Sequence, residues 1–210
     1  MTSAAEKFWR GDGGKEYTDR NLGKHLVASN TAFFARALAR TDHMIRILEF
    51  GAGAGLNMTA LRYLLPEAQL MAVEVNEHAA SQIVDADFIF RSSVQNFQVP
   101  QENQPDLVFT KGLLIHIPDS DLAQVYDKLY YSTRRYILVA EYHSPQREEI
   151  LYRGRPGLLW KGPYAEELMD RVNNRVGYLR GSLRLIDYGF VGKLDRWPQD
   201  DVTWWLFSKL

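Results

Sequence analysis

Apolar runs alternate with amphipathic stretches along most of the chain. Residues 44–50 (MIRILEF) are mostly apolar, as in a buried strand. Residues 55–65 (GLNMTALRYLL) then carry apolar side chains at helical spacing, and Pro66 ends that helix. The same alternation predicts the next elements: strands at 69–75, 87–93, 105–112 and 134–142, and helices at 77–84, 119–132 and 163–172.

The C-terminal part of the chain breaks this alternation. Residues 183–191 and 201–210 both have the pattern of strands, and only a loop joins them, so they should pair antiparallel. Repeated strand–helix units build a parallel sheet with helices on both faces. We therefore predict an α/β fold with a mostly parallel seven-stranded sheet and a terminal antiparallel strand pair. Asp119 or Ser120 should cap the helix at 119–132.

The stretch ahead of the first strand is different. Residues 7–21 (KFWRGDGGKEYTDRN) show neither helical nor strand periodicity, and their three glycines make them poor at forming structure alone. We expect residues 1–43 to be a lid or helical segment that orders over a bound ligand. Residues 44–210 should form the core of a single domain. The alternative is a packed N-terminal arm in which Trp9 fills a surface groove.

The composition narrows the functional classes. The 210 residues include 25 basic and 26 acidic side chains, and a net charge of -1 gives no field to attract nucleic acid or an acidic membrane. The absence of cysteine excludes disulfides, thiolate catalysis and cysteine-ligated zinc. No apolar run approaches the ~20 residues of a membrane span. We expect a cytoplasmic monomer or homodimer with a small-molecule partner, no metal, and no nucleic-acid or membrane partner.

Residues 48–57 (LEFGAGAGLN) join the first expected strand to its helix. Gly51, Gly53 and Gly55 let the backbone turn sharply and approach a ligand, and the start of the helix presents free N–H groups. Glu74 ends the second strand, where a carboxylate can accept hydrogen bonds from both hydroxyls of a ribose. We therefore expect a nucleoside site here; the alternative is a tight turn with no ligand.

The glycine spacing distinguishes between cofactors. A dinucleotide fingerprint, G-x-G-x-x-G, needs a third glycine where this chain has Leu56, which disfavours a nicotinamide dehydrogenase. The chain instead has G-x-G-x-G, with Glu49 two places before the first glycine. This pattern resembles the first motif of class I S-adenosylmethionine (SAM) methyltransferases. That family has a Rossmann-like fold which also ends in an antiparallel strand pair.

The resemblance implies SAM as the cofactor and assigns residues to it. Glu74 would hold the ribose, and Ser92 or Ser93 stands where the family usually has an Asp near the adenine. The methionine part would lie near Lys111 and His116. The resemblance and the pattern together give this set of expected cofactor-binding residues: Tyr17, Arg20, Glu49, Gly51, Ala52, Gly53, Gly55, Asn57, Glu74, Val75, Ser92, Ser93, Val94 and Lys111.

Longer phrases resemble a narrower group, the pseudaminic-acid-biosynthesis-associated methylases. The similar phrases are FWRGDGGKEYTDRN, DLVFTKGLLIHI, YILVAEYHSP, YRGR and YGFV…WPQDDVTWWL. They span nearly the whole chain. The resemblance implies a transferase that acts on a small molecule derived from a sugar or an amino acid.

Three segments should lie beyond the carboxyl ends of the strands, where the substrate is expected. They are the opening stretch, the loop 142–163 and the final hairpin loop. Trp9 or Tyr17 would face the sulfonium through a cation–π contact, and Arg20 would pair with the carboxylate of SAM. The expected substrate-binding residues are Trp9, His143, Tyr152, Arg153 and Arg155, and the two arginines suggest an anionic substrate unless they form a solvated turn.

The catalytic candidates are Tyr142, His116 and Glu141. Side chains alternate along a strand, so Tyr142 points opposite to Glu141 and His143. We favour Tyr142 in the pocket, because an aromatic wall shields the sulfonium and its hydroxyl can orient an acceptor. Two other functions stay open. One is a SAM-consuming enzyme that cyclises SAM to a cyclic amino acid and methylthioadenosine, and the other is a non-catalytic SAM-binding module.

Overall fold

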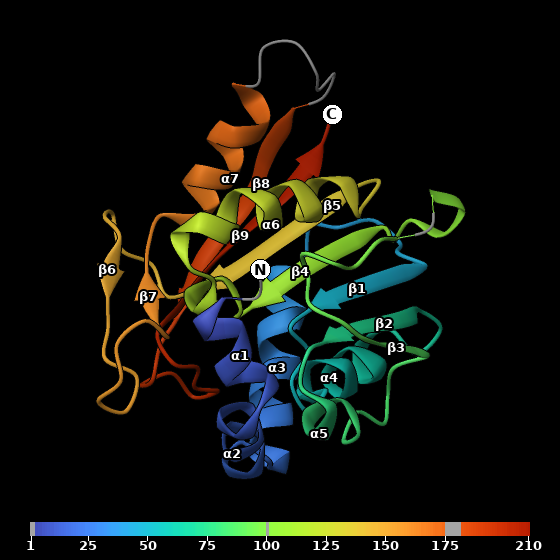
Figure 1. Cartoon of the computed structure of the whole chain (residues 1–210). Helices are drawn as coiled ribbons and strands as arrows, with labels where there is room; N and C mark the ends of the chain where they lie inside the picture. Colours follow the sequence, from blue (N-terminus) through green and yellow to red (C-terminus); the bar gives the residue numbers. More distant parts are fainter. Residues whose placement is uncertain (1–2, 100, 175–181) are drawn as a thin grey trace.

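The structure is a computed structural model that describes residues 3–99, 101–174 and 182–210. Within these residues, one sheet has seven strands in the order β3-β2-β1-β4-β5-β9-β8 (Figure 1). Its strands are β1 (Arg46–Phe50), β2 (Gln69–Glu74), β3 (Phe88–Arg91), β4 (Leu107–Lys111), β5 (Tyr136–Glu141), β8 (Leu183–Val191) and β9 (Val202–Lys209). A separate short ribbon pairs β6 (Glu148–Glu149) with β7 (Trp160–Lys161).

Helices α1, α2 and α3 precede β1, and the other α-helices lie between strands along the chain. They are α1 (Ala4–Arg10), α2 (Asp12–Arg20), α3 (Lys24–Ala37), α4 (Leu56–Leu64), α5 (Glu77–Ala80), α6 (Asp119–Tyr131) and α7 (Tyr164–Asn173). Two short 3-10 helices, η1 (Gln101–Asn103) and η2 (Leu114–His116), flank β4. The sequence-based bounds agree with these elements within a few residues, except that α5 ends at Ala80 rather than near residue 84.

The strand directions confirm the predicted fold class. Strand β1 pairs parallel with both β2 and β4, with Phe50 opposite Val73 on one side and Thr110 on the other. Strand β9 is antiparallel to both β5 and β8. The final hairpin therefore turns its second strand inward, between β5 and β8, and leaves β8 at the edge of the sheet.

Alternation of side chains along the strands divides the core between two faces of the sheet. Leu48 and Phe50 of β1 pack with buried residues of α6 and α7, whereas Ile47 packs with those of α3 and α4. Both faces of each central strand are covered, and this explains why those strands are continuously apolar rather than alternating.

One sequence-based expectation about local structure is wrong, the side-chain cap of α6. Residues 7–21 lack helical periodicity in their sequence, yet they form most of α1 and all of α2. Tertiary contacts compensate for the weak helical propensity of glycine, since a Cβ on Gly14 would lie 2.0 Å from the carbonyl oxygen of Trp9 and 2.6 Å from Asn76 Nδ2. Helix α6 has Pro118 at its N-cap position, and neither Asp119 nor Ser120 caps it.

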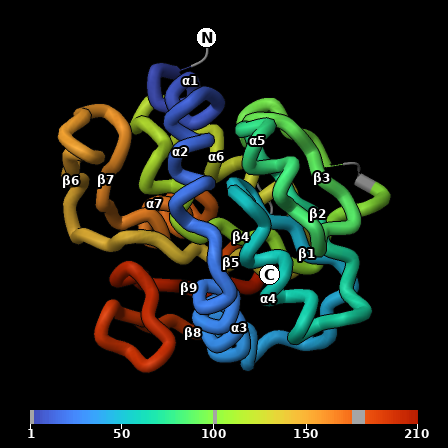
Figure 2. Tube along the Cα trace, turned by 90° about the horizontal axis from the view of Figure 1, so that it is seen from below, coloured from blue at the N-terminus to red at the C-terminus, as the bar shows by residue number. Residues whose placement is uncertain are grey.

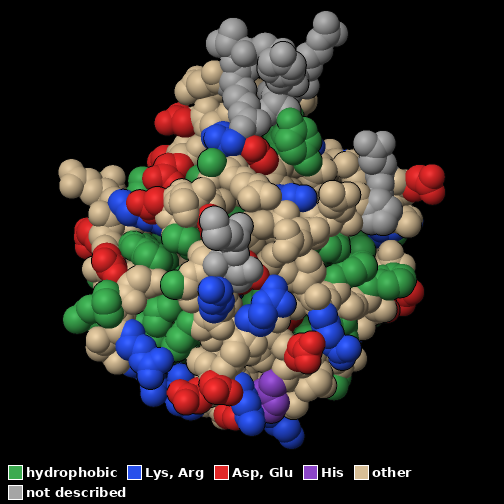
Figure 3. Space-filling view, viewed as in Figure 1, with side chains coloured by type: hydrophobic (Ala, Val, Ile, Leu, Met, Phe, Trp, Pro, Cys, Tyr) green, Lys and Arg blue, Asp and Glu red, His purple; other side chains and the backbone are tan. Residues whose placement is uncertain are grey.

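Charged side chains of both signs are interspersed on the face seen in Figure 3. None of the helices in the described part of the chain is long and apolar enough to span a bilayer.

Candidate active site

A cavity of about 410 Å³ opens at the carboxyl ends of the parallel strands. Five neighbouring strands contribute to its lining through the residues at or just beyond their ends: Ser92 after β3, Glu74 of β2, Gly51 after β1, Lys111 of β4 and Tyr142 after β5. Figure 1 shows α1 and α2 at the same edge of the sheet, towards which the arrows of β1, β4 and β5 point. The volume is in the lower part of the range of small-molecule sites.

The glycine loop between β1 and α4 forms the floor of the cavity. Gly51 and Gly53 have φ of +76° and +54°, which side-chain-bearing residues rarely adopt. Nothing lies within 4 Å of the position that a Cβ on Gly53 would take, so the backbone is open to a ligand there. Gly55 is outside the lining and serves packing, because its Cβ would lie 2.9 Å from Ile83.

Glu74 is anchored by backbone donors beside this loop. Its Oε2 accepts from the N–H of Gly53 at 2.7 Å, and its Oε1 accepts from the N–H of Asn76 at 2.8 Å. Burial raises the pKa of Glu74, and the backbone hydrogen bonds oppose that shift. A carboxylate oxygen can accept more than one hydrogen bond, so both oxygens keep capacity for a diol.

A second carboxyl group lies beneath the loop rather than in the cavity. Glu49 is fully buried, and its Oε1 accepts a hydrogen bond from Asn57 Nδ2 at 2.5 Å at the start of α4. Burial raises the pKa of Glu49 to about 8, despite that bond and the nearby ammonium of Lys111. Glu49 thus positions Asn57 and does not itself face a ligand, in contrast to its expected place among the cofactor-binding residues.

Lys111 is the one lysine or arginine among the described residues that line the cavity. Burial lowers its pKa, while the carboxyl groups of Glu49, Glu141 and Asp200 act in the opposite direction. It follows Thr110, which pairs with the last residue of β1, so Lys111 lies beside the glycine loop. Three polar atoms of the lining residues are buried without a partner among the described residues: Ser93 Oγ, Asn57 Oδ1 and Trp9 Nε1. A polar ligand that reaches these atoms would supply the missing hydrogen bonds.

Helices α1 and α2 close one side of the cavity. The Asn76 side chain donates hydrogen bonds to the carbonyl oxygens of Trp9, Arg10 and Gly11 at 2.9, 3.1 and 2.9 Å, and so fixes the end of α1. Figure 2 shows the two helices between the β6–β7 ribbon and α5. Trp9 and Tyr17 both line the cavity, with their ring centroids 5.7 Å apart.

The residues at the end of β5 divide as the strand alternation predicts. Tyr142 lines the cavity together with Asp200, and burial, assisted by the Asp200 carboxyl group, raises the pKa of the Tyr142 hydroxyl. Glu141 is fully buried beneath the cavity, where its carboxylate accepts from the N–H groups of Leu113 and Leu114 at 3.2 and 3.1 Å. His143 Nε2 lies 3.1 Å from Glu166 Oε1. Glu141 is therefore in position to hold η2, not to contact a substrate.

Several predicted site residues lie outside the cavity. Arg20 is exposed, 3.7 Å from Glu16 and 3.5 Å from the Tyr152 hydroxyl. Arg153 and Arg155 are also exposed and do not line the cavity. Tyr152, from the same loop, does line the cavity. The structure thus brings together Trp9, Tyr17, the glycine loop, Asn57, Glu74, Val75, residues 92–94, Lys111, His116, Tyr142 and Tyr152.

Sequence reasoning missed several lining residues. Asn76 follows Glu74 by two positions and starts α5, a signal that could have identified it. Asp200 and Gln199 come from the final hairpin loop, which was expected near the substrate although no residue in it was singled out. Gln199 Nε2 also donates to Asn30 Oδ1 at 3.1 Å, and no local pattern connects these two residues.

The architecture is similar to solved structures of SAM-dependent methyltransferases. One from Leishmania major shares 17% identity, with a TM-score of 0.68 over 98% of this chain and 81% of that chain. Magnesium protoporphyrin IX methyltransferase from Synechocystis PCC 6803, solved with bound SAM, shares 10% identity, with a TM-score of 0.65 over 97% and 94%. At such identities the likeness shows a Rossmann-like class I methyltransferase fold.

A third similar structure holds two bound small molecules. The 1,6-didemethyltoxoflavin-N1-methyltransferase of Burkholderia thailandensis, with bound 1,6-didemethyltoxoflavin and S-adenosylhomocysteine (SAH), shares 14% identity, with a TM-score of 0.64 over 98% of this chain and 86% of that chain. No family model matches this chain, and no curated protein matches it either.

Proposed function

We propose that the protein is a SAM-dependent methyltransferase that acts on a small molecule. The observation that carries this proposal is the juxtaposition of the open Gly53 backbone with Glu74, 2.7 Å from its N–H, on the floor of the cavity. That arrangement suits a ribose, as the resemblance to class I methyltransferases implies. The fold shared with enzymes solved with SAM or SAH supports the same cofactor.

The lining suggests how SAM would bind. Glu74 would accept from the ribose hydroxyls, and the 92–94 segment would lie along the adenine. Lys111 would pair with the carboxylate of the methionine part, a role expected for Arg20 from the sequence. The cofactor supplies an electrophilic methyl group: the C–S bond breaks with its electron pair left on sulfur, the acceptor forms the new bond, and SAH leaves.

The aromatic cover supports methyl transfer over simple binding. Trp9, Tyr17 and Tyr142 line the cavity on the side of the helices and of β5, and aromatic faces stabilise a sulfonium while excluding water. Residues 1–43 would then act as the lid segment expected from the sequence. An acceptor derived from a sugar or an amino acid, as the resemblance to the pseudaminic-acid-associated methylases implies, is part of this proposal.

Incubation of the purified protein with SAM tests the function directly. Products are identified by mass spectrometry with and without a panel of acceptors, and SAH binding is measured by calorimetry. SAH formed only with an acceptor supports methyl transfer. Failure of SAH and SAM to bind would contradict the proposal at its first step, and binding without any turnover would leave the non-catalytic module.

One observation favours a second candidate, cyclisation of SAM. Lys111 lines the cavity and burial lowers its pKa, which would favour exchange of a proton with the α-ammonium of SAM. The freed amine would attack the carbon next to the sulfonium, methylthioadenosine would leave, and a cyclic amino acid would remain. Methylthioadenosine produced without any acceptor would identify this reaction.

A further inference from the structure

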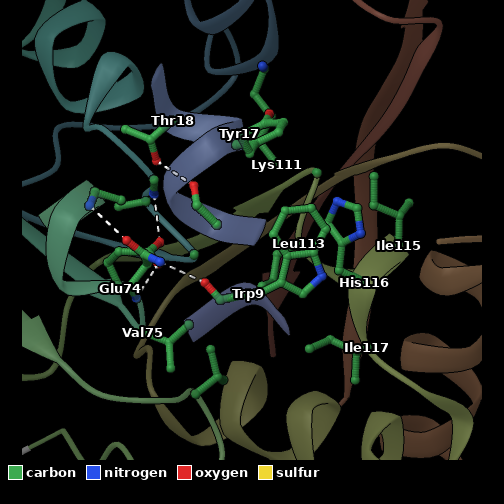
Figure 4. A pocket seen from close by; sticks show the side chains of 18 of the residues that line it. Trp9, Tyr17, Thr18, Glu74, Val75, Lys111, Leu113, Ile115, His116 and Ile117 are labelled. Carbon is green, nitrogen blue, oxygen red and sulfur yellow. Dashed lines mark hydrogen bonds between the residues drawn. The ribbon is translucent and has the colours of Figure 1, made fainter. Parts of the chain in front are cut away.

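Three aromatic rings form a wall of the cavity across from Glu74. The ring centroids of Trp9 and His116 are 4.1 Å apart, and Tyr152 lies 5.3 Å from Trp9 and 6.0 Å from His116. Figure 4 shows the rings of Trp9 and His116 together, with Glu74 on the opposite side of the view. The Trp9 ring comes from α1, the His116 ring from η2 and the Tyr152 ring from the loop 142–163. Helix α1 and this loop belong to two of the three segments expected near the substrate.

The hydrogen bond of His116 determines what this wall can bind. His116 Nδ1 is 2.7 Å from the carbonyl oxygen of Leu158, and a carbonyl can only accept, so Nδ1 carries the proton. Burial lowers the pKa of His116 to about 4, which keeps the ring neutral at neutral pH. Nε2 therefore presents a lone pair and has no hydrogen-bond partner among the described residues.

Trp9 supplies the matching donor. Its Nε1 atom is buried, and no acceptor among the described residues contacts it. A buried N–H without a partner costs free energy, which a ligand that accepts this hydrogen bond recovers. The wall thus presents one acceptor, His116 Nε2, and one donor, Trp9 Nε1–H, on adjacent rings.

The charges around the cavity disfavour an anionic group at this wall. Lys111 is the one lysine or arginine among the described lining residues, and it lies at the cofactor end beside the glycine loop. Arg155 lies over the Phe8 ring at 5.5 Å and does not line the cavity. Arg20, 3.5 Å from the Tyr152 hydroxyl, is exposed and does not line the cavity either. An anion against Trp9 and His116 would therefore lose its hydration without gaining a cation of the lining.

We propose that the methyl acceptor is an uncharged ring whose hydroxyl group donates to His116 Nε2 and accepts from Trp9 Nε1–H. This rests on the proposed methyl transfer. The hydroxyl oxygen takes the methyl group, SAH leaves with the C–S electron pair, and the hydroxyl proton passes to His116 Nε2 and then to water. The ring lies against the aromatic wall, and it can be an aromatic ring or the apolar face of a sugar.

Matched probes test this in SAH-saturated protein by ligand-observed NMR. Phenol is compared with anisole, and methyl β-glucoside with its fully O-methylated derivative; benzoate serves as the anionic probe. A hydroxyl probe should bind about 3- to 10-fold more tightly than its O-methyl analogue, the size of one hydrogen bond. The pair that shows this difference identifies the ring as aromatic or sugar.

Variants then locate the effect. His116→Phe should remove most of the difference between hydroxyl and O-methyl probes, whereas Trp9→Phe should weaken both members of a pair alike, because an ether oxygen still accepts from Trp9 Nε1–H. His43→Phe and Trp197→Phe, at exposed positions outside the cavity, should change neither the difference nor the affinities. Equal binding of each probe and its analogue, no binding of any probe, or tighter binding of benzoate would overturn the inference. Calorimetry with SAH alone reports separately on the proposed cofactor site.

Discussion

Three glutamates of this protein show how the environment of a residue decides its role. Glu74 lies at the cavity with backbone N–H groups on both oxygens, Glu49 is sealed beneath the glycine loop, and Glu141 holds the backbone of η2. All three stand at or near the carboxyl ends of strands, so residue type and position alone do not separate them. Burial and hydrogen-bond partners do.

The ribose contact makes a direct prediction. Glu74→Ala should weaken SAH binding by roughly 2–4 kcal/mol, the loss of two hydrogen bonds to a charged acceptor. Calorimetry measures the change, and Glu77→Ala on the exposed surface of α5 is the control. Unchanged affinity in Glu74→Ala would show that another residue holds the ribose.

The raised pKa of Glu49 predicts that the stability of the protein depends on pH. Its pKa is raised on folding from 4.5 to about 8, so between these values the folded chain keeps a proton that the unfolded chain loses, and the free energy of unfolding falls as pH rises. Glu49→Gln keeps an acceptor for Asn57 and removes the titration. The variant should gain stability relative to the native chain with rising pH, by at most about 1.4 kcal/mol per pH unit.

Denaturant unfolding at several pH values checks this sign. Glu102→Gln, at an exposed position of η1, is the control and should follow the native chain. Parallel curves for Glu49→Gln and the native chain would mean that Glu49 titrates normally in the folded state.

Tyr142 separates catalysis from binding. Tyr142→Phe should lower kcat by roughly 10- to 100-fold, because the hydroxyl that orients the acceptor is lost, and should leave SAH affinity nearly unchanged. Tyr131→Phe, exposed on α6, is the matched control. Turnover like that of the native chain in Tyr142→Phe would remove this hydroxyl from the mechanism.

At the scale of elements, the sequence predicts the strands of the sheet better than it predicts α1 and α2, the two helices that cover the cavity. Most strands can be predicted from their own apolar residues. The glycine motif can be predicted because the positive φ angles at Gly51 and Gly53 favour glycine locally. The placement of α1 and α2 depends instead on hydrogen bonds from Asn76, more than 60 positions away along the chain. It also depends on Gly14, whose missing side chain lets α2 approach Trp9 and Asn76 closely. Similarly, the exposure of Arg153 and Arg155 depends on how their loop packs, which no local pattern encodes.

Asn76 follows β2 and holds the end of α1 through hydrogen bonds from its side-chain amide. One substitution removes these hydrogen bonds alone. Asp at position 76 keeps the oxygen that caps α5 at the Ala79 N–H but loses the donor to the carbonyls of α1. Asn76→Asp should therefore speed trypsin cleavage within residues 10–20 and weaken SAH binding by about 3- to 10-fold. Asn103→Asp, exposed on η1, controls for the added charge, and unchanged cleavage would show that α1 is held by other contacts.

At the scale of the whole molecule, the cavity joins parts of the chain from α1 to the loop before β9. SAH at about 100 times its dissociation constant should raise the free energy of unfolding by about 2.7 kcal/mol. Deletion of residues 1–21 should remove most of the shift in melting temperature caused by SAH, because the sheet remains and the cover is lost. An undiminished shift would show that the two helices do not contact the ligand.

The position of β9 has a consequence for how the protein is made. Strand β8 leaves the ribosome before β9, yet β9 is its neighbour in the sheet and separates it from β5. While β9 is still being translated, β8 has no strand to pair with, and Asp200 and Val202 have not yet joined the wall of the cavity. The nascent chain can assemble β1 to β5 early, but its ability to hold a ligand arises only after β9 and the loop before it have been made.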